Sequence, residues 1–150
     1  MIILRHVDAP YCREFLLSDD DLKEQVALAI PYTFDENFEC LALEDGELQL
    51  AIGGLSDKEV IWLLTGPTVQ NLKLMQKVEF VQKVKELLDY FQKTNTDVPY
   101  FYNVVWSKLP NHHKFIESLG ARIDYSKTYK SEINEEFYYF VIDNPYYKEV

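Results

Sequence analysis

The amino-acid sequence predicts an α/β (α+β) fold with a mixed central sheet of about seven strands and about four helices, in a single domain over residues 1–150. Asp45-Gly46 lies between two alternating apolar runs, which is a strong hairpin signal. Residues 72–94 carry apolar side chains at three- and four-residue intervals, as an amphipathic helix does. The β-type run 100–106 follows, so we expect it to lie parallel to the strand before the helix.

The N-terminal part predicts one strand and two helices. Residues 2–7 form a short β-type run, and Asp8-Ala9-Pro10 supplies an N-cap and a first-turn proline. A second helix is predicted from the capping-box spacing of Asp21 and Glu24, and Pro31 should end it. Apolar residues recur along this helix at intervals of four: Leu22, Val26 and Ile30.

A three-stranded meander and a C-terminal strand pair complete the predicted sheet. Residues 39–44 and 47–53 form the hairpin, and residues 60–64 are nearly all apolar, as in a central strand. Pro110 should begin a short helix that Gly120 ends. Two further strands are predicted at 122–129 and 135–142, and residues 144–147 are expected to be irregular.

Composition restricts the class of protein. No apolar run approaches the roughly 20 residues that span a bilayer, and the N-terminus lacks the pattern of a signal peptide, so we expect a soluble intracellular protein. The two cysteines, Cys12 and Cys40, have no CxxC spacing. They are therefore expected to be reduced thiols rather than part of a disulfide framework or a zinc site.

The net charge of -10 is concentrated in the first third of the chain. About half of the acidic residues lie between Asp8 and Glu47, where Arg13 and Lys23 are the basic residues. Such a field repels phosphate backbones and argues against direct nucleic-acid binding. It suits a cationic partner or acceptor, although the simpler interpretation is that the acids solvate one exposed face and keep the protein soluble. An acidic mimic of DNA that inhibits a host protein is a further alternative.

The order of predicted elements resembles that of the GNAT (N-acetyltransferase) superfamily over nearly the whole chain. Within it the chain is most similar to the small internal virion protein A family of short-tailed phages. That similarity rests on Leu50-Ala51-Ile52-Gly53-Gly54, on Asn103-Val104-Val105-Trp106, on His112 with Phe115, and on Leu119-Gly120-Ala121. The resemblance implies a phage protein made in the cytoplasm of a bacterial host. A role in virion assembly, association with the virion and a phage or host protein partner are the corresponding expectations; the oligomeric state is left open.

Acetyl-CoA is the one cofactor that the resemblance admits. In GNAT enzymes acyl-CoA lies between splayed central strands, and its pyrophosphate sits on backbone N–H groups where the long helix begins. The usual signature, Arg or Gln followed by spaced glycine or alanine positions, is absent from residues 65–71, and Pro67 removes one N–H. The residues that the resemblance assigns to the cofactor are Leu64, Thr65, Gly66, Thr68, Gln70, Asn71, Asn103 and His112.

The sequence does not identify the catalytic residues. The family's general acid is a tyrosine four residues before the glycine that ends the last helix, and that position is Ile116, which has no proton to donate. Tyr102 or Tyr125 could substitute from a neighbouring strand. His112 is expected to line the cleft, and no metal site is predicted because no HxxxH or HxxE pattern is present.

Besides the acidic mimic of DNA, two functions remain open. The first is a binding or virion-assembly accessory protein that keeps the GNAT-like fold and has lost its acyl-CoA site. The second is an acetyl-CoA-dependent N-acetyltransferase that acts on a cationic acceptor.

Overall fold

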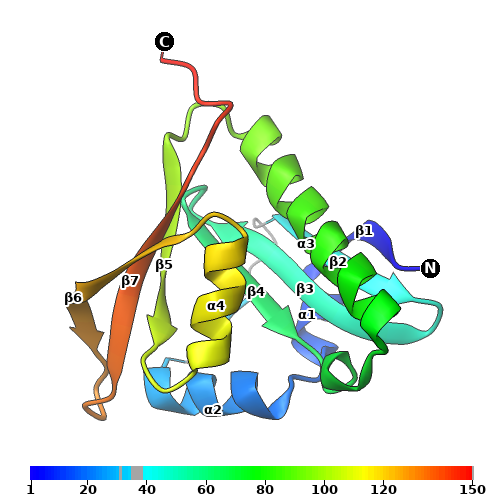
Figure 1. The fold of residues 1–150 in the computed structure, drawn as a ribbon, viewed down its shortest axis with the longest axis horizontal. Helices are drawn as coiled ribbons and strands as arrows, with labels where there is room; N and C mark the ends of the chain where they lie inside the picture. Colours follow the sequence, from blue (N-terminus) through cyan, green and yellow to red (C-terminus); the bar gives the residue numbers. More distant parts are fainter. Residues whose placement is uncertain (31, 35–38, 150) are drawn as a thin grey trace.

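The computed structural model describes residues 1–30, 32–34 and 39–149, and they contain one seven-stranded mixed sheet (Figure 1). The sheet order is β1-β2-β3-β4-β5-β7-β6, and every neighbouring pair is antiparallel except β4 and β5. The strands are β1 (Ile3–Val7), β2 (Glu39–Asp45), β3 (Leu48–Ser56), β4 (Val60–Thr65), β5 (Tyr100–Trp106), β6 (Arg122–Lys130) and β7 (Glu136–Asp143). The predicted mixed α/β fold is confirmed.

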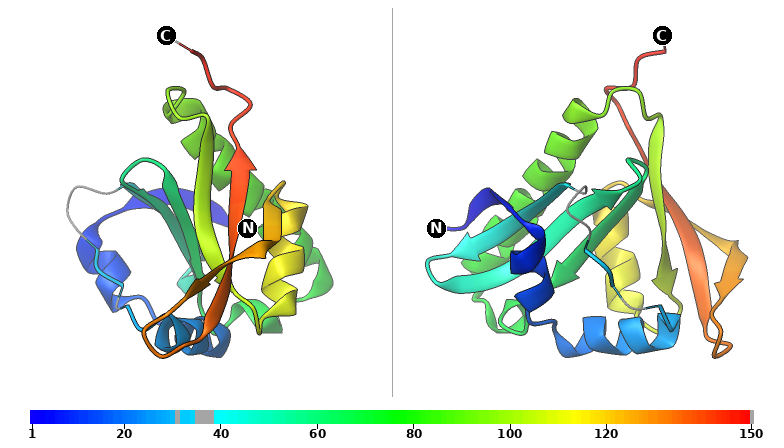
Figure 2. Two further views of the ribbon diagram at one scale, coloured as in Figure 1. Left: turned by 90° about the vertical axis from the view of Figure 1, so that its left-hand side faces the viewer. Right: turned by 180° about the vertical axis from the view of Figure 1, so that it is seen from behind.

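The helices lie on both sides of the sheet. They are α1 (Ala9–Glu14), α2 (Asp19–Leu28), the 3-10 helix η1 (Val69–Asn71), α3 (Leu74–Thr94) and α4 (Pro110–Ser118). Helices α3 and α4 cover one face, and α1 covers the other (Figure 2, right). Alternate residues of β2 follow this division, because Leu41 and Leu43 pack towards α3 while Cys40 and Ala42 pack with α1. Helix α2 runs across the end of the sheet where β4 and β5 part.

Strands β4 and β5 separate soon after they meet. Their pairing is confined to Val60 opposite Tyr102, and the Tyr102 N–H donates to the Glu59 carbonyl at 2.9 Å. Beyond this point the two strands diverge towards α2 (Figure 1). The backbone groups on the facing edges need other partners there, because buried N–H and C=O groups are almost always hydrogen-bonded.

Two predicted helix boundaries differ from those observed. Helix α2 begins at Asp19 because Ser18 is the N-cap, and its side chain accepts from the Asp21 N–H at 3.3 Å. It ends at Leu28, with Ala29 in the left-handed region at a φ of 59°, and Pro31 lies outside the described residues. The apolar stripe on this helix faces outward rather than the core; its exposed members are Leu22, Val26 and Ile30.

The long helix also begins later than its apolar pattern predicts. Leu72 is buried but precedes the helix, whose first residue is Leu74. Met75 and Val78, on the first two turns of α3, are exposed and do not belong to the core. The buried face of the helix consists of Phe80, Val84, Leu87, Leu88, Phe91 and Gln92. No helix in the described residues is long and apolar enough to cross a membrane.

Candidate functional site

A cavity of about 360 Å³ occupies the space where β4 and β5 diverge. Helix α2 lies at one end, and α3 and α4 contribute the covering side chains. Most of the wall is apolar, including Phe80 and Val84 of α3 and Val105 of β5. The polar side chains of the wall include Asp21, Glu24, Tyr32, Thr65, Asn103 and His112. An apolar cavity with a few convergent polar groups is the usual form of a small-molecule site.

Asp21 closes the end of β4 from α2. Its Oδ2 accepts from the Thr65 N–H at 2.6 Å and from the Thr65 hydroxyl at 2.7 Å. The Ser18 hydroxyl lies 3.2 Å from the same oxygen, and the Ser18 N–H donates to the Thr65 carbonyl at 2.8 Å. The edge of β4 at Thr65 is therefore fully hydrogen-bonded within the protein.

Two further side-chain contacts lie along the gap between the strands. Glu24 Oε2 accepts from the Trp106 N–H at 3.1 Å, which satisfies the far end of β5. The Asn103 side-chain amide donates to the Ile61 carbonyl at 2.7 Å and thus bridges β5 to β4. Strand groups alternate in direction, so Leu63, between Ile61 and Thr65, also turns its N–H and C=O to this gap.

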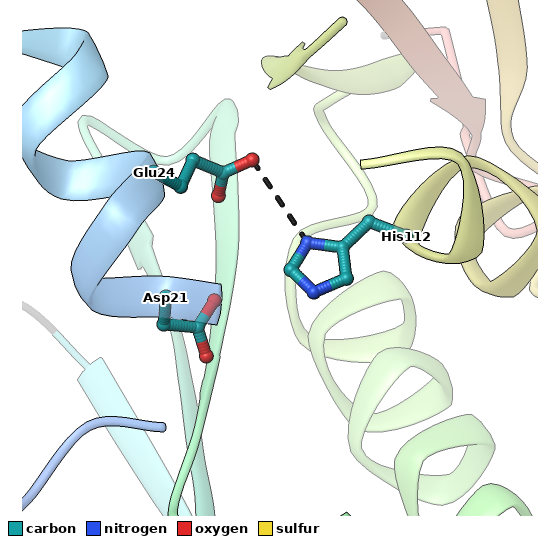
Figure 3. Close-up of side chains that lie close together, drawn as sticks. All are labelled: Asp21, Glu24 and His112. Atoms are coloured by element: carbon teal, nitrogen blue, oxygen red, sulfur yellow. Dashed lines mark ion pairs between the residues drawn. The ribbon is translucent and has the colours of Figure 1, made fainter. Parts of the chain in front are cut away.

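A histidine and two carboxylates meet at the mouth of this gap (Figure 3). His112 Nδ1 lies 3.9 Å from Glu24 Oε2, and its Nε2 lies 4.0 Å from Asp20 Oδ2. Burial alone would lower the pKa of His112, but Glu24, and then Asp21 and Asp20, outweigh it and raise that pKa. Burial raises the pKa of the Asp21 carboxyl, although its hydrogen bonds from Thr65 oppose the shift. These carboxylates therefore favour the protonated form of His112.

The same three side chains have the chemistry of a metal site. One ligand atom from each of Asp21, Glu24 and His112 lies within 4.8 Å of the others. Imidazole and carboxylate ligands together suit zinc and similar transition ions. Two of the three are already engaged, since Asp21 accepts from Thr65 and Glu24 accepts from Trp106. The contacts of His112 with Glu24 (3.9 Å) and Asp20 (4.0 Å) are also within the range of an ion pair.

The Glu24→Gln substitution should lower the pKa of His112, because it removes the main charge that opposes burial. In the wild-type protein we expect that pKa above its ordinary value of 6.5. A raised pKa in the folded state gives stability that is complete below the unfolded pKa and lost as pH rises through the folded pKa. NMR titration, with His112→Gln to assign the resonance, measures both values. A wild-type pKa at or below 6.5 contradicts the ion pair.

Five N–H groups of the loop between β4 and α3 donate hydrogen bonds to acceptors within the protein. The loop occupies the place where the GNAT pyrophosphate would bind, and Pro67 has no N–H at all. The recorded donors are Gly66 to the Leu50 carbonyl (2.8 Å), Val69 to Gly66 (3.4 Å), Asn71 to Thr68 (3.1 Å), Leu72 to Val69 (3.2 Å) and Lys73 to Gln76 Oε1 (2.9 Å). A phosphate that used these five N–H groups would have to displace these bonds.

Among the described residues, one tyrosine that the sequence pattern did not single out lines the cavity. Ile116 lines the cavity from α4, at the position where a GNAT enzyme carries its proton donor. Neither Tyr102 nor Tyr125 is among the lining residues, whereas Tyr32 is. Burial, followed by the nearby carboxylates of Glu24 and Asp21, raises the pKa of Tyr32, so its hydroxyl keeps its proton at neutral pH.

Most of the residues assigned to a cofactor from sequence line the cavity, although cofactor binding by them stays a prediction. Thr68 and Asn71 lie outside its lining, although Val69 and Gln70 between them line it. Those that line it are Leu64, Thr65, Gly66, Gln70, Asn103 and His112. The sequence reasoning missed Asp21, Glu24 and Tyr32. The three-residue spacing of Asp21 and Glu24, which places them on one helix face, was the available signal.

Solved structures with similar folds are N-acetyltransferases. The ribosomal-protein-S18-alanine N-acetyltransferase from Escherichia coli is 15% identical, with a TM-score of 0.60 over 100% of this chain and 97% of that one. A spermidine N-acetyltransferase SpeG variant from Vibrio cholerae is 13% identical, with a TM-score of 0.64 over 95% of this chain and 94% of that one. These likenesses establish the GNAT fold.

Sequence comparison points to a phage family. The family model described as Bacteriophage T7, probable scaffold protein Gp13, matches residues 39–129. The probable scaffold protein gp13 of Escherichia phage T7 is 27% identical over 122 residues, which covers 81% of this chain and 85% of that protein. The chain therefore has a GNAT fold and belongs to the phage T7 probable scaffold protein gp13 family.

Proposed function

We propose that this chain is a phage accessory protein for virion assembly, which binds phage or host proteins and does not transfer acyl groups. The observation that carries the proposal is the loop between β4 and α3, whose N–H groups at Gly66, Val69 and Asn71 are bonded within the loop or to β3. Ile116, at the position of the missing proton donor, supports it. The name of the T7 relative, a probable scaffold protein, points in the same direction.

The proposed place of action follows from this role. A protein that takes part in assembling phage particles works in the cytoplasm of the infected bacterium and can remain associated with the virion. Its acidic N-terminal third suits a basic protein partner better than DNA or RNA. An acidic mimic of DNA is less well supported, because Asp21 and Glu24 accept hydrogen bonds from strand N–H groups.

A second candidate function is acetyl transfer from acetyl-CoA to a cationic acceptor. The cluster of Asp21, Glu24 and His112 at the cavity favours it, because carboxylates attract an amine. Leu63 offers backbone groups on the open edge of β4, and Tyr32 carries a protonated hydroxyl in the same cavity. In this alternative Tyr32 would serve as the general acid, because Ile116 occupies the position of the usual tyrosine.

Complementation of a phage that lacks this gene separates the two functions. A double substitution, Glu24→Gln with His112→Gln, keeps an oxygen acceptor for the Trp106 N–H but removes two of the three charged side chains of the Asp21, Glu24 and His112 cluster. The assembly proposal predicts that this variant restores the yield of infectious particles to within about twofold of wild type. A folded, normally expressed variant that restores no particles would favour cavity chemistry instead.

A further inference from the structure

The fold brings the two cysteines of this chain together. Cys12 lies on α1 and Cys40 on β2, and their Sγ atoms are 3.0 Å apart across the packing interface of these elements. Each residue is 2% exposed, and both thiols are free. Cys12 and Cys40 are 28 positions apart, without any spacing motif, so their meeting is a product of the tertiary fold.

The backbone on both sides fixes this approach. Cys40 is opposite Val7 in the β1–β2 ladder, and α1 begins directly after β1. Asp8 caps α1 by accepting from the Tyr11 N–H at 3.0 Å, and the Cys12 N–H donates to the Asp8 carbonyl at 3.2 Å. The first turn of α1 therefore places Cys12 against Cys40 of β2. A disulfide needs a closer approach of the sulfurs, which side-chain rotation can supply when the backbones are held near one another.

We propose that Cys12 and Cys40 form a thiol–disulfide site, which a low-molecular-weight disulfide of the glutathione type oxidises to an intramolecular disulfide. The Cys12 thiolate attacks one sulfur of the oxidant, forms a mixed disulfide and releases one thiolate. The Cys40 thiolate then attacks Cys12 Sγ and releases the second. The protein loses two thiol hydrogens, the oxidant is reduced to two thiols, and one new S–S bond joins α1 to β2.

The environment of the two sulfurs assigns their order of reaction. A hydrogen bond with Cys40 lowers the pKa of the Cys12 thiol, although burial opposes this effect. The same bond and burial raise the pKa of the Cys40 thiol. Cys12 is therefore the first nucleophile, since the thiolate is the reactive form.

The segment that this bond would enclose includes part of the cavity wall. The chain enclosed between Cys12 and Cys40 contains α2, which supplies Asp21 and Glu24 to the cavity wall. A cross-link at the base of this segment restricts the unfolded chain and stabilises the attachment of α1 to the sheet. In a reducing cytoplasm the site stays in its thiol form, and it closes when the protein meets an oxidising medium.

The test compares oxidation of the folded and unfolded protein. The whole chain is equilibrated over a series of reduced-to-oxidised glutathione ratios, once in buffer and once in concentrated guanidinium chloride. The sample in buffer is refolded from the denatured state in the presence of glutathione, so that burial of the thiols does not limit their oxidation. The samples are quenched with acid, and the intact mass of the protein is measured. Formation of the disulfide lowers that mass by about 2 Da. Cys12→Ser and Cys40→Ser are the matched controls, and dithiothreitol should reverse the change.

We expect the equilibrium constant for the intramolecular disulfide to be at least about tenfold larger in the folded protein. The oxidised wild type should then unfold at least about 3 °C higher than the reduced form, with no such shift in either serine variant. An equilibrium constant in the folded state that is equal to or smaller than the constant in the unfolded state overturns the proposal. A product that consists of glutathione adducts or disulfide-linked dimers overturns it as well.

Discussion

Asp21→Ala is expected to lower the free energy of unfolding by about 3 kcal/mol. Asp21 is 3% exposed, and its Oδ2 accepts from both the N–H and the hydroxyl of Thr65. Alanine leaves that N–H without a partner at the partly buried end of β4, and it removes the side-chain link from Asp21 to the sheet. Urea unfolding followed by circular dichroism gives the difference, provided that the slope with denaturant is unchanged.

Two matched variants separate this effect from a general loss of negative charge. Asp21→Asn keeps a carbonyl oxygen for Thr65, so it should cost only about 1 kcal/mol. Asp20→Ala changes an exposed residue of the same helical turn and should stay within about 0.5 kcal/mol of wild type. Equal losses from Asp21→Ala and Asp20→Ala would mean that the hydrogen bonds to Thr65 do not hold β4 and α2 together.

Asn144→Ala is expected to cost about 2 kcal/mol. Asn144 is 5% exposed and follows β7, where its side-chain amide donates to the carbonyls of Gln92, Asn95 and Val98 at 2.9–3.1 Å. It thus supplies hydrogen bonds to carbonyl groups at the end of α3, which has no glycine there to close it. The midpoint of thermal unfolding measures the loss.

The chemistry of the amide can be tested with a second substitution. Asn144→Asp has the same shape and still accepts from the Tyr146 N–H, but it places a carboxyl oxygen against three carbonyls. It should therefore destabilise the protein at neutral pH at least as much as alanine does. Asn111→Ala, at an exposed position of α4, is the control. An aspartate variant as stable as wild type would refute the capping role of Asn144.

The fold was largely predictable because its signals are local. The hairpin was found from Asp45-Gly46, although the turn lies one residue later, with Asp45 opposite Leu48 and Gly46 at a φ of 62°. Periodicity located α3 but not its first residue, because Met75 and Val78 continue the apolar pattern on turns that the sheet does not cover. Leu22 and Val26 follow a helical pattern while facing outward, so pattern alone could not assign their burial.

The site was less predictable because it joins distant segments. Glu24 meets the Trp106 N–H across 82 positions, and Asp21 meets Thr65 across 44. No spacing rule connects such pairs until the strands β4 and β5 are known to diverge. The position of Ile116 was predictable, since it depends only on counting from Gly120 along one helix. The pairing of Cys12 and Cys40 had no sequence signal beyond the presence of two cysteines.

Isothermal titration of the purified protein with acetyl-CoA tests the central claim most directly. The account predicts no binding heat at millimolar ligand, because the loop N–H groups at Gly66, Val69 and Asn71 are already bonded and Pro67 offers none. An active GNAT enzyme of known acetyl-CoA affinity, titrated in the same buffer, is the positive control. Binding at micromolar strength that is lost in Asn103→Ala, together with acetylation of a polyamine or basic peptide, would contradict the account.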